Sequence, residues 1–311
     1  MIKIGIFGYG AVGASIYSEL ETNYDSCYIV ADQKRINCYS KKLIINHEKE
    51  INVRFSDNIL CDYLFICVKN YQLKDSIKSI TRFIKNETII IPMLNGIDAY
   101  DYLKMSFPNN RIFYGVINIE ANKTNNVLIK GKILNLQFGY EYNDKLADEI
   151  IILKNILDNS KINNNVYPDM KKRVWLKYML NMGINQVSAL ANFSYQNMNN
   201  ELILESLYNI FNEVLIVAEA YNINITKDDV NELMIMCKNF NSERFTSLAL
   251  DYQNNRKNEI DTFSGRLIEL ASKKNIDIPI NKFIYSILKT KNNINNIWGA
   301  IWNQKYILHQ V

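Results

Sequence analysis

Two groups of residues in this 311-residue chain have the residue types and the spacing of a ligand-binding or catalytic site. The first is a glycine turn near the start, made of Gly8, Tyr9, Gly10, Ala11, Val12 and Gly13. The second is a polar stripe, defined as Lys177, Asn181 and Asn185, which recurs every fourth residue in an otherwise apolar segment. A G-x-G-x-x-G turn binds the pyrophosphate of a dinucleotide when it joins a strand to a helix. A lysine that is partly desolvated in a cleft can donate a proton near neutral pH.

The sequence around the glycine turn predicts the strand and the helix that such a site needs. Residues 2–7 form a short apolar run typical of a buried parallel strand, and residues 14–20 can form a helix. In that setting Gly8 permits the tight turn, Gly10 lets the backbone approach a pyrophosphate, and Gly13 lets the helix pack on the strand. We therefore predict a dinucleotide site. The alternative is a glycine-rich turn in some other α/β protein.

The type of dinucleotide depends on the end of the next predicted strand. Residues 27–31 form a second apolar run that ends at Asp32, where a carboxylate binds the free ribose of NAD. Lys34 and Arg35 follow after Gln33, and either can hold the 2′-phosphate of NADP. The choice between the two cofactors stays open on these residues.

Further strands and helices alternate through the first half of the chain. The pattern predicts a hairpin near residues 43–53, a helix over 73–84, and strands over 63–68, 88–92, 111–119 and 127–138. This alternation favours a doubly wound parallel sheet of the Rossmann type. Ligands of such sheets lie beyond the carboxyl ends of the strands, which directs attention to Lys69 and Asn95.

The second half has a different pattern, and the Asn-rich segment 159–168 suits a domain boundary. We predict a dinucleotide-binding domain over residues 1–166 and an all-helical domain over residues 167–311. The expected helices span residues 169–191, 199–221, 227–239, 241–274 and 280–290, with Asp169 and Thr226 as N-caps of the first and third.

The polar stripe lies on the first of these helices. Positions i, i+4 and i+8 share one helix face, so the three side chains form a line on a helix that is apolar nearly all round. Buried polar groups need partners, and a polar ligand would supply them. The alternative is an ordinary solvent-facing edge.

Composition argues against several classes of function. The 36 Lys and Arg residues against 32 Asp and Glu give a net charge of only +4, without a basic stripe that would bind nucleic acid. Two histidines and five cysteines without C-x-x-C spacing argue against a metal site and for reduced thiols. Since the chain starts with a strand and has no long apolar run, we expect a cytoplasmic protein without membrane contact.

Seven features in order resemble the ketopantoate reductases (2-dehydropantoate 2-reductases). They are the glycine turn, Val68-Lys69 with Gln72, Leu94-Asn95-Gly96, Trp175-Leu176-Lys177, the two stripe asparagines, Ser247 and Glu259. The resemblance covers almost the whole chain, and the stripe with the later serine and glutamate is more specific than the turn. It implies a Rossmann domain, a helical C-terminal domain, and NADPH-dependent reduction of 2-dehydropantoate to (R)-pantoate, a step of pantothenate and coenzyme A biosynthesis.

The resemblance also implies a role for each residue. Lys177 would be the general acid, and Glu259 would act near both substrate and cofactor. Asn181, Asn185 and Ser247 would bind the substrate, and Asn95 would touch both substrate and nicotinamide. The remaining cofactor contacts would come from the glycine turn, Asp32, Arg35, Lys69 and Ala121.

On the substrate side two positions depart from the family pattern: Gln186 replaces a proline after the stripe, and Tyr195 replaces a further asparagine. On the cofactor side, Asp32 stands where many members have a basic residue for the 2′-phosphate of NADP. A paralogous reductase of another 2-oxo acid is therefore a second hypothesis. A dinucleotide sensor without catalysis is a third, although a sensor would need neither Lys177 nor Glu259. The apolar helical half makes a homodimer plausible.

Overall fold

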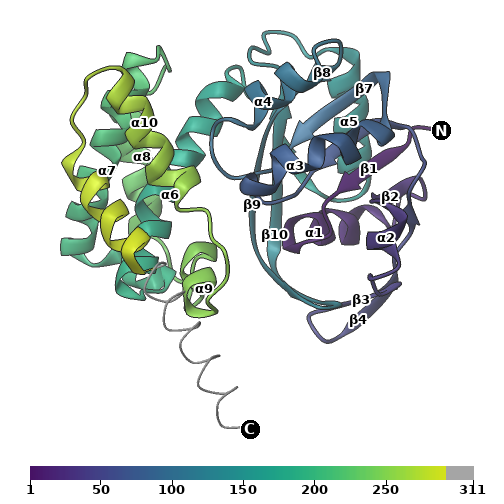
Figure 1. The fold of residues 1–311 in the computed structure, drawn as a ribbon, viewed down its shortest axis with the longest axis horizontal. Helices are drawn as coiled ribbons and strands as arrows, with labels where there is room; N and C mark the ends of the chain where they lie inside the picture. Colours follow the sequence, from purple (N-terminus) through teal and green to yellow (C-terminus); the bar gives the residue numbers. More distant parts are fainter. Residues whose placement is uncertain (292–311) are drawn as a thin grey trace, which may run out of the picture. The chain divides into compact units, whose positions relative to one another are not determined.

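The structure is a computed structural model that describes residues 1–291, apart from the side chains of residues 132 and 133. The chain divides into two compact units, Met1–Val174 and Trp175–Val311. Figure 1 draws the first unit in purple to teal and the second in green to yellow. The boundary predicted at residues 166 and 167 stays a prediction.

The first unit is built on a six-stranded parallel sheet with the order β5-β2-β1-β6-β7-β8. This confirms the predicted Rossmann-type sheet. The strands are β1 (Ile4–Phe7), β2 (Cys27–Val30), β5 (Phe55–Ser56), β6 (Cys61–Ile66), β7 (Ile84–Pro92) and β8 (Arg111–Ile112). The helices of this unit are α1 (Ala11–Leu20), α2 (Gln33–Ile36), α3 (Asn70–Ile80), α4 (Ala99–Ser106) and α5 (Asp148–Asn159).

Both faces of the parallel sheet are buried, which explains why its strands read as continuous apolar runs. Ile4 and Ile6 of β1 belong to a core cluster with α1 and α5, whereas Phe7 belongs to a second cluster with α3 and α4. Alternate residues of a strand point to opposite faces, so a sheet covered on both sides needs apolar residues at every position. The central strand β1 is therefore fixed firmly, and the glycine turn at its end is fixed with it.

A second sheet of five strands, which the sequence did not predict, lies in the same unit. It contains β3 (Lys42–Ile45), β4 (Lys49–Asn52), β9 (Tyr114–Thr124), β10 (Val127–Gly139) and β11 (Asn163–Asn165). The predicted strand 111–119 is divided at Phe113 between β8 of the parallel sheet and β9 of the second sheet. The hairpin of β9 and β10 is the long curved ribbon beside α1 in Figure 1. Periodicity gives the direction in which side chains point, but it does not show which sheet a strand joins.

The described part of the second unit is helical, as predicted. Its elements are α6 (Met170–Ala191, which begins in the first unit), a 3-10 helix (Tyr195–Asn199), α7 (Glu201–Ala220), α8 (Lys227–Lys238), α9 (Ser247–Gln253), a π-helix (Asp261–Gly265), α10 (Arg266–Lys273) and a helical segment over 279–291. Both predicted caps are confirmed: Asp169 accepts from the backbone N–H of Lys172 at 2.8 Å, and Thr226 from that of Asp229 at 3.3 Å.

The single helix predicted over residues 241–274 was wrong. This stretch contains α9, the π-helix and α10, and segments without regular secondary structure precede and follow α9. Asn255 has a φ of 49° just after α9, a left-handed conformation that a continuing α-helix does not permit. Asparagine adopts this conformation more readily than most residues, so the Asn-Asn pair ends the helix although apolar residues recur beyond it.

Candidate functional site

The glycine turn has the geometry that a dinucleotide requires. Gly8 has a φ of +107°, and a Cβ there would lie 2.7 Å from the backbone of Cys67. A Cβ at Gly13 would collide with the carbonyl oxygen of Gly8, so α1 packs directly on the end of β1. In contrast, a Cβ at Gly10 would meet nothing within 4 Å, so the space outside this residue is open. Gly10 is also the N-cap of α1 and has no side-chain cap, which leaves the first N–H groups of the helix for an anion. These residues fit a pyrophosphate.

The two middle residues of the turn, Ala11 and Val12, begin α1 and are partly exposed, whereas the Tyr9 side chain is buried. Asp32 follows β2 and serves as the N-cap of α2, where its carboxylate accepts from the backbone N–H of Arg35 at 2.9 Å. The Arg35 side chain lies 3.7 Å from the same carboxylate. The acid that would bind a free ribose and the base that would bind a 2′-phosphate are therefore paired with each other.

Lys69 and Asn95 follow the carboxyl ends of β6 and β7, as the sequence predicts. Lys69 is the N-cap of α3, and its backbone N–H donates to the side chain of Gln72 at 3.1 Å. The Asn70 side chain donates to the carbonyl of Asn95 at 2.9 Å, so the two turns are joined. Ala121 lies in β9 opposite Lys130 of β10. Each of these residues is at least partly exposed.

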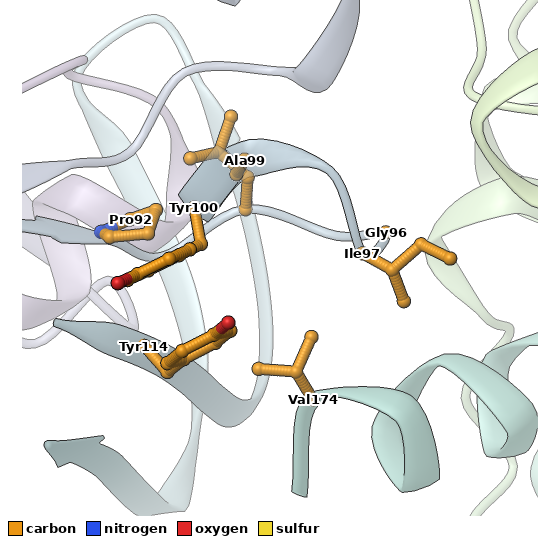
Figure 2. Close-up of a pocket in the computed structure, with 9 residues that line it drawn as sticks. Pro92, Gly96, Ile97, Ala99, Tyr100, Tyr114 and Val174 are labelled. Atoms are coloured by element: carbon orange, nitrogen blue, oxygen red, sulfur yellow. The ribbon is translucent and has the colours of Figure 1, made fainter. Parts of the chain in front are cut away.

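A pocket beside the Asn95 turn was not predicted from the sequence. It is a shallow pocket of about 250 Å³, a volume that includes open solvent, and it is lined by Pro92, Leu94, Gly96, Ile97, Ala99, Tyr100, Tyr114, Gly115 and Val174. The Tyr100 and Tyr114 rings stack with centroids 3.9 Å apart and an interplanar angle of 7°. Figure 2 shows these stacked rings beside Val174, with Ile97 opposite. The Lys104 amine, one turn of α4 after Tyr100, donates to the carbonyls of Pro108 and Asn110.

The polar stripe lies in the buried part of α6. Asn181 and Asn185 are each only 4% exposed, and Lys177 is half-buried. Burial of its amino group lowers the pKa of Lys177 from 10.5 to about 8. No ion pair or hydrogen bond joins the side chains of Lys177 or Asn185 to any residue within 1–291. A cation with a lowered pKa next to buried amides can bind an anionic ligand and give up a proton to it.

Ser247 and Glu259 lie in different local elements. Ser247 is exposed and begins α9, just after the N-cap Thr246. Glu259 is buried and precedes the π-helix, whose first N–H groups, on Thr262 and Phe263, donate to the carbonyl of Glu259 at 2.9 and 3.1 Å. π-helical turns occur often at functional sites, because they reposition one side chain relative to the helix that follows.

The two positions that depart from the family pattern have structural partners. The Gln186 side chain is fully buried, accepts from the hydroxyl of Ser264, and donates to the side chain of Asn281 at 3.5 Å. The Tyr195 ring packs edge-on against Phe240, with centroids 5.2 Å apart.

Neither a metal-binding cluster nor a membrane-spanning helix occurs within residues 1–291. No cluster of three or more His, Cys, Asp or Glu side chains there has the arrangement of a metal site. In that same part of the chain, every helix is too short or too polar to cross a bilayer.

Known proteins resemble this chain over almost its full length. A 2-dehydropantoate 2-reductase of Streptococcus pyogenes is 24% identical over 307 residues, which cover 94% of this chain and 98% of the relative. An uncharacterized oxidoreductase of Bacillus subtilis, YkpB, is 22% identical over 300 residues, with 93% and 98% covered.

Solved structures share the fold. A dimeric ketopantoate reductase of Staphylococcus aureus matches with a TM-score of 0.81 and 22% identity, over 94% of this chain and all of that one. A D-mandelate dehydrogenase, solved with NADH and anilino(oxo)acetate, matches with a TM-score of 0.82 and 20% identity, over 95% of this chain and all of that one.

Two family models match the chain and together account for both of its halves. The ketopantoate reductase PanE/ApbA model matches residues 4–140, and the model of the C-terminal part of the same family matches residues 169–292. The first range contains the glycine turn and Asn95, and the second contains the polar stripe, Ser247 and Glu259. The chain belongs to the ketopantoate reductase PanE/ApbA family of oxidoreductases.

Proposed function

We propose that this protein is a 2-dehydropantoate 2-reductase that uses NADPH to form (R)-pantoate. Membership of the family and the S. pyogenes relative support the reaction. The observation that carries the proposal is Lys177, whose buried amino group has its pKa lowered to about 8 and has no carboxylate partner within residues 1–291. A structural lysine would extend its charge to water or pair with an acid.

Lys177 acts as the general acid in this proposal. The bound dinucleotide supplies the hydride for the ketone carbon of the substrate. Negative charge then develops on the ketone oxygen, and the Lys177 ammonium stabilises this charge and gives up a proton to it. An acid whose pKa lies near the working pH is best suited to this transfer, and burial brings Lys177 to that range.

The other residues bind and orient the substrate. The Asn181 and Asn185 amides donate hydrogen bonds to the substrate carboxylate without adding charge to the site. Ser247, exposed at the start of α9, binds the hydroxyl end. Asn95 contacts both the substrate and the nicotinamide, and Glu259 acts near both. Lys69 and Ala121 contact the cofactor.

NADPH is the proposed cofactor, although Asp32 by itself favours NADH. The 2′-phosphate would compete with the Asp32 carboxylate for the Arg35 guanidinium, which lies 3.7 Å from that carboxylate and is more than half exposed. Arginine binds phosphate with two parallel hydrogen bonds. Arg35→Ala should therefore weaken NADPH more than NADH, and equal losses of affinity would show that Arg35 does not contact the 2′-phosphate.

A second candidate function is reduction of another 2-oxo acid. The relative YkpB has no assigned substrate, and a structural neighbour acts in mandelate chemistry. Gln186 and Tyr195, at positions where the family pattern has other residues, are already engaged in protein contacts. Without the usual asparagine at Tyr195, the site has one amide fewer for the hydroxyl end of the substrate.

Steady-state kinetics with a panel of 2-oxo acids and both cofactors test the proposal. The highest kcat/KM should belong to 2-dehydropantoate with NADPH, ahead of straight-chain, branched and aromatic 2-oxo acids. A clear preference for another acid would establish the second candidate. Cofactor binding without turnover of any acid would instead indicate a sensor.

We also propose a homodimer, by analogy with the dimeric S. aureus reductase. Light scattering during size-exclusion chromatography measures the mass directly. The single chain has a mass of 36.3 kDa, so a value near that figure at micromolar concentration would contradict the dimer.

A further inference from the structure

A lysine from the long hairpin lies over the aromatic residue of the glycine turn. The amino nitrogen of Lys123, in β9, is 4.1 Å from the centroid of the Tyr9 ring. Tyr9 stands between Gly8 and Gly10, so this contact places a positive charge beside the turn. The two residues are far apart in the sequence and meet because the hairpin packs along α1.

The Tyr9 ring is held by two further aromatic residues. The Tyr39 and Phe55 rings meet it edge-on, with centroids 5.3 and 5.5 Å away. Asp32 and Arg35 lie close enough to Tyr39 for their charges to influence the pKa of its hydroxyl. The group made of Tyr9, Tyr39 and Phe55 therefore links the glycine turn to the end of β2, where the adenosine half of a dinucleotide binds in a Rossmann fold.

The charge of Lys123 is only partly compensated within residues 1–291. Its amine donates to the carbonyl of Asn125 at 2.6 Å, and no carboxylate in that part of the chain pairs with it. The side chain is half-buried, and burial lowers the pKa of its amine. A cation that is partly desolvated and has no anion close by binds an incoming anion more strongly than an exposed lysine would.

We propose that Lys123 is a phosphate-binding residue for the dinucleotide cofactor. The Tyr9 ring positions its ammonium through a cation–π contact, and the open space outside Gly10 admits the phosphate. The phosphate is either the pyrophosphate, which the turn itself contacts, or the 2′-phosphate, which lies toward Asp32 and Arg35. The proposal rests on the dinucleotide-binding part of the proposed function and is independent of the 2-oxo acid.

The experiment is a calorimetric measurement of Kd for NADPH and NADH with the full-length protein. The central variant is Lys123→Met, which keeps the length of the side chain and removes its charge. Lys123→Arg keeps the charge and the contact with the ring and should restore most of the affinity. Lys145→Met, at an exposed position of the same unit, controls for the general loss of one positive charge. Melting temperatures on the same preparations identify any variant that fails to fold.

We expect Lys123→Met to raise Kd by roughly 10- to 100-fold, the worth of one hydrogen bond to a charged group. Equal losses for both cofactors identify the pyrophosphate, and a loss confined to NADPH identifies the 2′-phosphate. A Kd within twofold of the Lys145→Met value for both cofactors, or a failure of Lys123→Arg to restore affinity in a folded protein, would overturn the proposal. A wild-type protein that binds dinucleotide but reduces no 2-oxo acid would refute the proposed reaction and leave this inference intact.

Discussion

Two neighbouring residues of α6, Asn185 and Gln186, are equally buried amides with opposite surroundings. Asn185 is 4% exposed, and no residue within 1–291 forms a hydrogen bond with its side chain. Gln186 is fully buried, and its side chain bonds to Ser264, to Asn281 and to the backbone carbonyl of Met182. The two residues point to different faces of the helix.

The face of Gln186 belongs to a closed network, defined here as Gln186, Ser264, Asn281 and Glu213. The Glu213 carboxylate accepts from the backbone N–H groups of Ile280 and Asn281 at 2.8 and 2.9 Å, and from the Asn281 side chain at 2.8 Å. This network joins α6, α7, the π-helix and the segment 279–291. The face of Asn185 carries the polar stripe, where the Lys177 amine also has no protein partner within 1–291. A complete set of partners indicates a structural role, and an incomplete set indicates a ligand.

The largest effect should come from the polar stripe. Lys177→Met should lower kcat by roughly 10²- to 10⁴-fold, the usual worth of a positioned general acid. The melting temperature should stay the same or rise, because burial disfavours the charge that the variant removes. Both quantities are measured on one preparation. Normal turnover with a lowered melting temperature would mean that Lys177 is a structural residue.

A substitution in the closed network should instead lower stability and leave substrate binding unchanged. Glu213→Ala leaves the backbone N–H groups of Ile280 and Asn281 and the buried side-chain amide of Asn281 without their acceptor, which costs about 3 kcal/mol or more of unfolding free energy. Urea denaturation measures this loss, and Glu205→Ala, at an exposed position of the same helix, is the matched control. Substrate KM should stay near the wild-type value in the protein that remains folded. If Glu213→Ala folded with unchanged stability, the network on the Gln186 face of α6 would not have the structural role that distinguishes it from the Asn185 face.

The adjacent pair gives the most direct comparison. Asn185→Leu should raise the KM of the 2-oxo acid by about tenfold, the worth of one hydrogen bond to a carboxylate, and should leave stability unchanged or improved. Gln186→Leu should lower stability by about 1–3 kcal/mol, because it leaves Ser264 and Asn281 unsatisfied. Its KM should change little. If the two variants had the same effects on KM and on stability, the presence or absence of hydrogen-bond partners would not indicate the roles of these side chains.

The smallest effect is a dependence on pH. A general acid must be protonated, so kcat for reduction should be constant below the pKa of Lys177 and fall as the pH rises through about 8. At the pKa the rate should be about half of its maximum. The residual kcat of Lys177→Met should not show this fall at high pH. If the variant kept the fall in kcat at high pH, a group other than Lys177 would be the general acid.

The sequence predicted most of the first unit, because the glycine turn is a local structure. The apolar run before Gly8, the turn itself and the helix after it lie within 20 residues, and the structure confirms the strand and the helix. The special geometry of Gly8 and Gly13 depends on contacts close in sequence, apart from that with Cys67. Sequence patterns within one short segment were therefore sufficient to predict the conformation of these residues.

The features that were not predicted depend on contacts between distant segments. Lys123 meets Tyr9 only because β9 belongs to a second sheet, and nothing in its own segment indicates that contact. Asn185 and Gln186 carry nearly the same side chain, so residue type alone does not show which of them has partners. The helix break at Asn255 was missed because the apolar pattern continues beyond it.

The pairing of Asp32 with Arg35 has a consequence for the redesign of cofactor preference. In many dinucleotide enzymes, one substitution at the acidic position is the obvious first step toward NADP. Here the same carboxylate caps α2 and pairs with Arg35, so its removal would loosen the backbone that carries the base. Asp32→Ala alone should therefore be a poor starting point, and Asp32→Ser, which keeps an N-cap oxygen, should be a better one. In this protein, cofactor preference and the start of α2 have to be engineered together.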